Sequence, residues 1–236
     1  MNPPANVAGP ALIVIAKEPV PGRAKTRLSP PLSPEQGAWL AAAALDDTFA
    51  AVLETELPAR RVAAFDGDPR GWVPAQFEVI AQVDGGLDRR LAAAFAEVGG
   101  PALLVGMDTP QLTPDLLDAA LATLLGDGVD AVLGLAPDGG YWAIGFREPD
   151  AGALLGVPMS AETTGADQLE RLHGLGLTVE MLPELRDFDS FDDALAVAAE
   201  APGSHLAAAI DPIARGLGLG REPGETRQPD PASGGR

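Results

Sequence analysis

Residues 11–28 read A-L-I-V-I-A-K-E-P-V-P-G-R-A-K-T-R-L, an apolar run that passes directly into a basic loop. The apolar part, Ala11–Ala16, is short and rich in aliphatic residues, which predicts a buried strand. The segment after it contains both lysines of the chain, Lys17 and Lys25. A strand that opens into such a loop favours an α/β sheet with a ligand site beyond the carboxyl end of its first strand.

The loop is a basic island in an acidic protein. By formal counting its charge is about +3, whereas the whole chain carries −18. Gly22, preceded by two prolines, favours a turn that brings backbone N–H groups close to an anion. The alternative is a solvated turn, but the chain uses arginine almost everywhere else, and solvation alone does not require lysine. We therefore assign nucleotide phosphates to Lys17, Gly22, Arg23, Lys25, Thr26 and Arg27.

The rest of the chain alternates apolar runs with alanine- and leucine-rich stretches. Further strands are predicted at residues 61–65, 77–81, 102–106, 131–135, 141–146 and 177–182. Helices are predicted at residues 33–53, 87–98, 113–125, 165–172 and 191–199, the first and third opened by S-P-E and T-P-D capping signals. This alternation predicts a three-layer α/β/α, Rossmann-like fold with a mostly parallel sheet and right-handed crossovers.

Length and composition favour a single domain at residues 10–215, a flexible N-terminus at 1–9 and a disordered tail at 216–236. No apolar run approaches the ~20 residues that span a bilayer, so we expect a soluble, cytoplasmic protein without a membrane partner. The acidic balance opposes nucleic-acid binding. The absence of cysteine excludes thiolate chemistry, and His173 and His205, which have no nearby histidine or carboxylate at ligand spacing, are expected to be structural or solvated.

Asp108 follows the predicted strand at 102–106, at the same carboxyl edge as the basic loop. Mg²⁺, or Mn²⁺ in its place, takes protein carboxylates together with substrate phosphates, so one aspartate here suffices for a metal-nucleotide site. The alternative is a turn or capping aspartate before Pro110. We take Asp108 as the first metal ligand.

The segment P-D-G-G-Y-W at residues 137–142 joins two predicted strands. It could be a tight Asp-Gly hairpin turn. Its two glycines would also let a substrate approach the backbone, which makes Asp138, Gly139, Gly140 and Tyr141 substrate-binding candidates. Asp138 is the acid–base or hydroxyl-binding candidate among them.

Two further loops carry weaker signals. In R-D-F-D-S at residues 186–190, Asp187 is the second predicted metal ligand, whereas Asp189 or Ser190 could cap the following helix. Capping and metal binding are both open for this segment. The turn that contains Gly85 and Gly86 is expected to border the nucleotide base.

Together, K-x-P-x-P-G-x-x-K-T-R-L, G-x-D-x-P at 106–110, D-G-G-Y-x-x-I-G at 138–145 and D-x-D-S resemble a bacterial family of GT-A-fold transferases described as uncharacterised or as arsenosugar-biosynthesis-type glycosyltransferases. The chain is also similar to the guanylyltransferases that activate phospholactate. The resemblance covers residues 10–200 and implies a nucleotide-diphospho-sugar transferase-like fold, with the basic loop at the phosphates and Asp108 at the metal. Gly106 departs from the paired aspartates of well-studied metal-dependent glycosyltransferases.

Three functions follow as hypotheses. The first is glycosyl transfer from a nucleotide sugar to a small acceptor, with Lys25, Asp108 and Asp138 as catalytic residues. The second is nucleotidyl transfer from a nucleoside triphosphate to a small phosphorylated or carboxylated acceptor with release of pyrophosphate, which the four cations of the loop favour on charge. The third is a non-catalytic nucleotide-binding domain. The base, the acceptor and the oligomeric state stay open.

Overall fold

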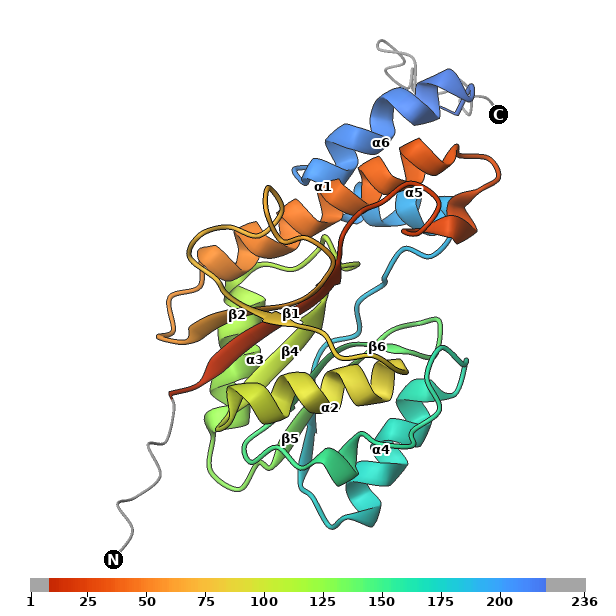
Figure 1. Ribbon diagram of the computed structural model, residues 1–236. Coiled ribbons are helices and arrows are strands. Elements are labelled where there is room, and N and C mark those ends of the chain that lie inside the picture. The colour runs from red at the N-terminus through yellow and green to blue at the C-terminus, as the bar shows by residue number, and fades with distance from the viewer. Residues whose placement is uncertain (1–8, 220–236) are drawn as a thin grey trace, which may run out of the picture.

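The protein is represented by a computed structural model that describes residues 9–219 (Figure 1). Most of the predicted flexible N-terminus at 1–9, and residues 220–236 of the predicted tail, lie outside this range. The first part of the predicted tail is ordered instead: Gly216 is the last residue of a helix, and the amide of Leu219 still donates to Ala214 O at 2.8 Å.

A seven-stranded sheet forms the centre of the molecule, with strand order β3-β2-β1-β4-β6-β5-β7. All predicted strands are present, with ends that differ by up to two residues. Only β6 runs antiparallel to its neighbours, β4 and β5, so the prediction of a mostly parallel sheet is confirmed. The bounds are β1 Ala11–Lys17, β2 Arg60–Asp66, β3 Glu78–Ala81, β4 Ala102–Gly106, β5 Ala131–Leu135, β6 Tyr141–Phe146 and β7 Val179–Met181.

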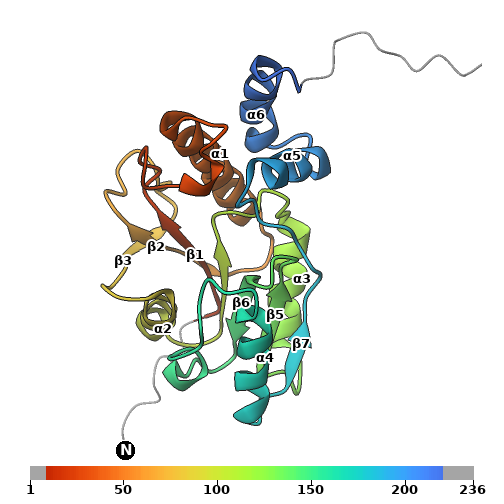
Figure 2. The same cartoon turned by 90° about the vertical axis from the view of Figure 1, so that its right-hand side faces the viewer.

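Helices cover both faces of the sheet, which gives the predicted three layers (Figure 2). Successive residues of a strand point to opposite faces, and the strands divide their side chains accordingly between two cores. Leu12 and Val14 pack with α1 (Pro34–Leu53) and α3 (Pro114–Leu125) on one face. Ala11 and Ile13 pack with α2 (Leu87–Val98) and α4 (Thr164–Gly174) on the other.

The helix starts confirm the predicted capping signals. Ser33 accepts a hydrogen bond from Gln36 N, and Gln36 Oε1 accepts one from Ser33 N, so α1 opens with a complete capping box. Thr113 caps α3 by accepting from Leu116 N. The two caps set the residues at which α1 and α3 begin, after the loops at the carboxyl edge of the sheet.

A third apolar cluster lies away from the sheet and joins the C-terminal helices to α1. Here α5 (Phe191–Glu200) and α6 (His205–Gly216) pack with Leu40 of α1, together with Leu28 from the basic loop and Phe188. The range of α6 was not among those predicted. By burying Leu28 and Phe188 together, this cluster brings the basic loop and the segment before α5 into contact.

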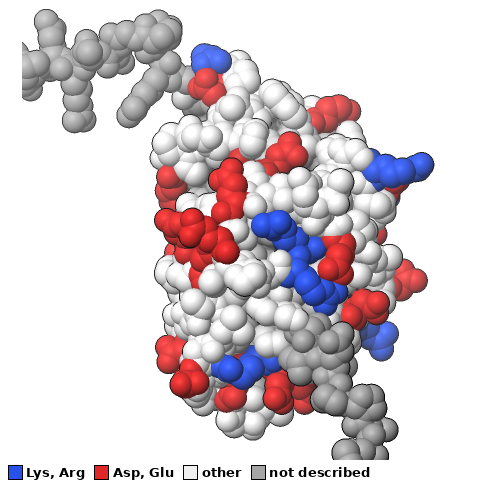
Figure 3. All heavy atoms as spheres, turned by 90° about the vertical axis from the view of Figure 1, so that its left-hand side faces the viewer, with Lys and Arg blue, Asp and Glu red and all other residues white. Residues whose placement is uncertain are grey.

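None of the helices in the described range is long and apolar enough to cross a bilayer. On the face drawn in Figure 3, a group of Lys and Arg side chains near the centre has Asp and Glu side chains on both sides.

Candidate functional site

Three of the predicted site segments meet at the carboxyl edge of the sheet. The basic loop follows β1, Asp108 follows β4, and Asp138 lies in the turn between β5 and β6. A cavity of about 220 Å³ opens between the basic loop and Asp108. Its lining includes five of the six predicted phosphate residues, Lys17, Arg23, Lys25, Thr26 and Arg27, whereas Gly22 is not among them.

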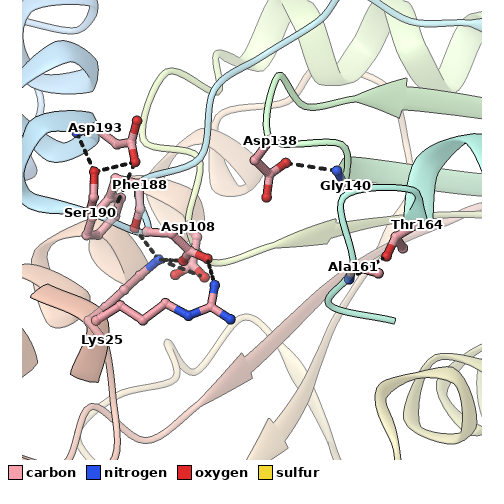
Figure 4. Close-up of polar contacts among 11 residues, drawn as sticks. Lys25, Asp108, Asp138, Gly140, Ala161, Thr164, Phe188, Ser190 and Asp193 are labelled. Carbon is pink, nitrogen blue, oxygen red and sulfur yellow. Dashed lines mark hydrogen bonds and ion pairs between the residues drawn. The ribbon is translucent and has the colours of Figure 1, made fainter. Parts of the chain in front are cut away.

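Lys25 lies at the centre of this cavity wall, and its side chain is only 7% exposed. Its ammonium nitrogen is 3.1 Å from Asp108 Oδ2 and donates to Asp189 Oδ1 at 3.1 Å and to Phe188 O at 2.5 Å (Figure 4). Burial lowers the pKa of this amine, but the two carboxylates outweigh burial and raise it overall. Lys25 is therefore a charged, enclosed lysine at neutral pH.

Asp138, Asp187 and Asp189 form a second group of charges beside Lys25. Their nearest carboxylate oxygens all lie within 4.8 Å of one another. Burial raises the pKa of Asp187 to about 6, and Asp138 adds to the shift while Lys25 opposes it. The two aspartates predicted to hold the metal thus fall in different groups: Asp187 belongs to this triad, and Asp108 pairs with Lys25.

Local geometry explains why Asp189 can join this group. Ser190 is the N-cap of α5. Its hydroxyl oxygen accepts a hydrogen bond from Asp193 N, and its backbone N–H donates one to the Asp193 carboxylate. The helix therefore takes its cap from Ser190, and Asp189 is left to pair with Lys25 and, at 2.7 Å, with Arg27 Nη1. Of the two open possibilities, capping is the role of Ser190.

The P-D-G-G-Y-W segment is a hairpin turn, as the alternative prediction held, because Gly139 N donates to Ala136 O and Ala136 N to Gly140 O. Asp138 accepts from Gly140 N at 2.8 Å, which orients its carboxylate (Figure 4). Gly139 has φ +90°, and a Cβ placed there would lie 1.9 Å from Glu162 O. Only glycine fits, so the turn is locked against the loop before α4.

The remaining predicted residues lie around this centre. Tyr141 is largely enclosed, and its hydroxyl donates to Met159 Sδ at 3.8 Å. Burial raises the pKa of this phenol, so it is a neutral group rather than a base. Gly85 and Gly86 precede α2 and do not line the cavity beside Lys25. Between α2 and β3 lies a separate cavity of about 410 Å³.

Sequence reasoning missed two residues of this site. Phe188 places its ring centroid 4.1 Å from the Lys25 ammonium, in cation–π range. Ser160 lines the cavity from the loop before α4 with φ +59°, an uncommon conformation for a residue with a Cβ. No sequence pattern distinguishes either one, because their partners come from distant segments.

Residues 40–161, just over half of the chain, match the model of the family described as "Uncharacterized protein conserved in bacteria (DUF2064)". The chain belongs to the DUF2064 family. No curated protein matches it in sequence. The matched segment contains Asp108 and Asp138, whereas the basic loop and Asp187 lie outside it.

Solved structures share the fold of this DUF2064 chain. A candidate nucleotide-diphospho-sugar transferase from Desulfovibrio desulfuricans G20 has a TM-score of 0.78 at 23% identity and covers 91% of this chain and 100% of its own. A cytidylyltransferase from Leptospira borgpetersenii has a TM-score of 0.53 at 11% identity, covering 90% and 96%. A CMP:2-keto-3-deoxy-manno-octonic acid synthetase, solved with CTP, has 0.51 at 13%, covering 82% and 97%. The predicted nucleotide-diphospho-sugar transferase-like fold is confirmed.

Proposed function

We propose that the chain is a metal-dependent transferase that takes its donor from a nucleotide sugar and passes the sugar to a small acceptor. The observation that carries this proposal is the convergence of a basic loop and four carboxylates at one sheet edge. That edge is where open α/β sheets bind their ligands. The fold shared with a candidate nucleotide-diphospho-sugar transferase agrees with it.

The charges at the site call for a cation. The four carboxylates of the site, those of Asp108, Asp138, Asp187 and Asp189, are matched by four cations, Lys17, Arg23, Lys25 and Arg27, so the formal charge is about zero. A bound diphosphate would add about −2 by formal counting, and a divalent ion would offset this charge. The donor set fits Mg²⁺ or Mn²⁺, because these ions prefer carboxylate oxygens and the three oxygens of the triad lie within 4.8 Å of one another.

Asp138, Asp187 and Asp189 would hold this ion. When bound, it would neutralise charge on the diphosphate that leaves during sugar transfer. Lys17 and Arg23, both exposed on the cavity wall, would bind the phosphates. Gly85 and Gly86 would border the base, and Asp138, the exposed member of the triad, would orient an acceptor hydroxyl.

Nucleotidyl transfer is the second candidate, favoured by the fold shared with a cytidylyltransferase. The ion pairs of the loop favour a triphosphate less than the four formal charges of the sequence do. Lys25 and Arg27 are paired with aspartates, so within the described residues Lys17 and Arg23 are the loop cations without an ion pair. Two cations suit a diphosphate better than a triphosphate. The more specific form of the first proposal is arsenosugar-type glycosyl transfer. The more specific form of the second is guanylyl transfer to phospholactate.

The test is calorimetric titration of the full chain with UDP-, GDP-, dTDP- and CDP-sugars and the four nucleoside triphosphates, each with and without Mg²⁺. We expect one nucleotide sugar to bind only with Mg²⁺. When an acceptor is added, the nucleoside diphosphate of that donor should be released. Release of pyrophosphate from a triphosphate would establish the second candidate instead. Tight binding without Mg²⁺ and without turnover would indicate a non-catalytic domain.

Two matched variants locate the metal. Asp187→Asn should abolish the Mg²⁺ dependence of binding, because it removes a carboxylate of the triad. Asp192→Asn removes the same charge from the exposed first turn of α5 and should leave binding unchanged. Equal effects of the two variants would show that overall charge, not a metal at the triad, controls binding.

A further inference from the structure

Three protein oxygens surround the Lys25 ammonium. A lysine ammonium has three N–H donors, and Lys25 Nζ lies within hydrogen-bond or ion-pair distance of Asp108 Oδ2, Asp189 Oδ1 and Phe188 O. Its side chain is 7% exposed, whereas that of Arg27, two residues on, is 69% exposed. A phosphate oxygen could reach Lys25 only by displacing one of these partners.

The surroundings of Lys25 keep it in this place. Its backbone adopts the left-handed conformation, with φ 48° and ψ 42°, immediately before the short helix at Thr26–Leu28. On its far side, the fully buried Phe188 ring covers the ammonium and is itself packed into the cluster of α1, α5 and α6. Lys25 is thus an enclosed cation of the cavity wall, whereas Lys17 and Arg23 on the same wall are exposed.

We propose that Lys25 is a positioning residue and not a phosphate ligand, an inference that rests on the proposed function. The Lys25 ammonium is a built-in counter-cation that holds Asp108 and Asp189 together. It also competes with the divalent ion for Asp189. Asp189 is the shared element, because it belongs both to the Lys25 ion pair and to the triad. Lys17 and Arg23 then make the phosphate contacts of the loop.

The first experiment separates these roles with ligands that need no knowledge of the base. Mn²⁺ alone, and inorganic pyrophosphate at saturating Mn²⁺, are titrated into the wild-type chain, Lys25→Met and Arg23→Met. In Lys25→Met, removal of a positive charge beside the triad should tighten Mn²⁺ binding by about tenfold. Pyrophosphate affinity should stay within about threefold of wild type, whereas Arg23→Met should weaken it by about tenfold or more.

The outcomes are distinct. Pyrophosphate binding weakened tenfold in Lys25→Met would make Lys25 a phosphate ligand and overturn the inference. Mn²⁺ binding that is unchanged or weaker in Lys25→Met would also overturn it, because loss of a cation that competes for Asp189 should leave that carboxylate freer to bind the metal. A wild-type chain that binds neither Mn²⁺ nor pyrophosphate would overturn the proposed function itself.

A second measurement uses the wild-type protein and so does not depend on whether Lys25→Met folds. The chain has two lysines, so labelling with ¹⁵N-lysine gives two ammonium groups for NMR. Lys17 is exposed, whereas the enclosed Lys25 ammonium should exchange slowly and give an observable signal. Mg²⁺ alone should shift this signal. The inference would be overturned if the chemical shift of the Lys25 ammonium stayed the same with Mg²⁺ but changed with pyrophosphate.

Discussion

Lys25 and Asp189, which are 164 residues apart in sequence, meet in a 3.1 Å ion pair at the carboxyl edge of the sheet. One comes from the loop after the first strand and the other from the residue before the N-cap of α5. This contact joins the basic loop to the acidic triad. The geometry of the site therefore depends on how the C-terminal helices pack on the rest of the protein.

The hairpin turn at Gly139 should not tolerate a side chain. Gly139→Ala would force a Cβ into the left-handed region and against the Glu162 carbonyl, at a cost of about 3 kcal/mol or more in unfolding free energy. Denaturant unfolding measures this cost. Gly174→Ala, at the end of α4 with open space around it, is the control and should lie within about 0.5 kcal/mol of wild type.

The raised pKa of Asp187 should make stability depend on pH. The folded carboxyl titrates near 6 and the unfolded one near 3.8, so the folded state binds the proton more tightly and stability falls as pH rises between these values. Asp187→Asn removes this penalty and should stabilise the protein at pH 7.5 by about 1–2 kcal/mol, after allowance for solvent screening. The difference should vanish below pH 4 in unfolding experiments without metal. A variant less stable than wild type at pH 7.5 would contradict this account.

Trp142 should support the segment that leads to the triad. Its indole Nε1 donates to Pro183 O at 2.9 Å, and its ring is buried under β5 at Gly134. Trp142→Phe should lower the unfolding free energy by about 1 kcal/mol, because Pro183 loses its donor, and should weaken Mn²⁺ binding. Trp39→Phe changes a half-exposed tryptophan on α1 and should change neither quantity.

Asp47 should anchor α6. Its carboxylate accepts from His205 N at 2.7 Å and from Leu206 N at 3.0 Å, so a residue of α1 caps the first turn of α6. Asp47→Ala should cost about 1–2 kcal/mol and speed amide hydrogen exchange in α5 and α6. The neighbouring Asp46 is exposed, and Asp46→Ala should leave exchange there unchanged. Equal exchange in the two variants would assign the anchoring to apolar packing alone.

Much of the fold could be read from local patterns. The apolar runs predicted all seven strands, and the capping residues Ser33 and Thr113 predicted the starts of α1 and α3. Such signals are local because a cap bonds within its own first turn, and a strand shows its burial in its own composition. The helix α6 lies outside the predicted ranges although Ser204 caps its start locally, because Pro212 in its interior interrupts the helical pattern.

The sequence by itself determined the layered α/β fold and the placement of a basic loop at the carboxyl end of β1, because a parallel sheet brings its loops to fixed edges. Only the tertiary structure decided which charges meet. Lys25 turns inward to Asp108 and Asp189, and Asp138 joins Asp187 through the antiparallel β6 hairpin. These pairings unite segments from opposite ends of the chain. Packing of Phe188 beneath α5 and α6 sets their distances, and no local pattern encodes such a contact.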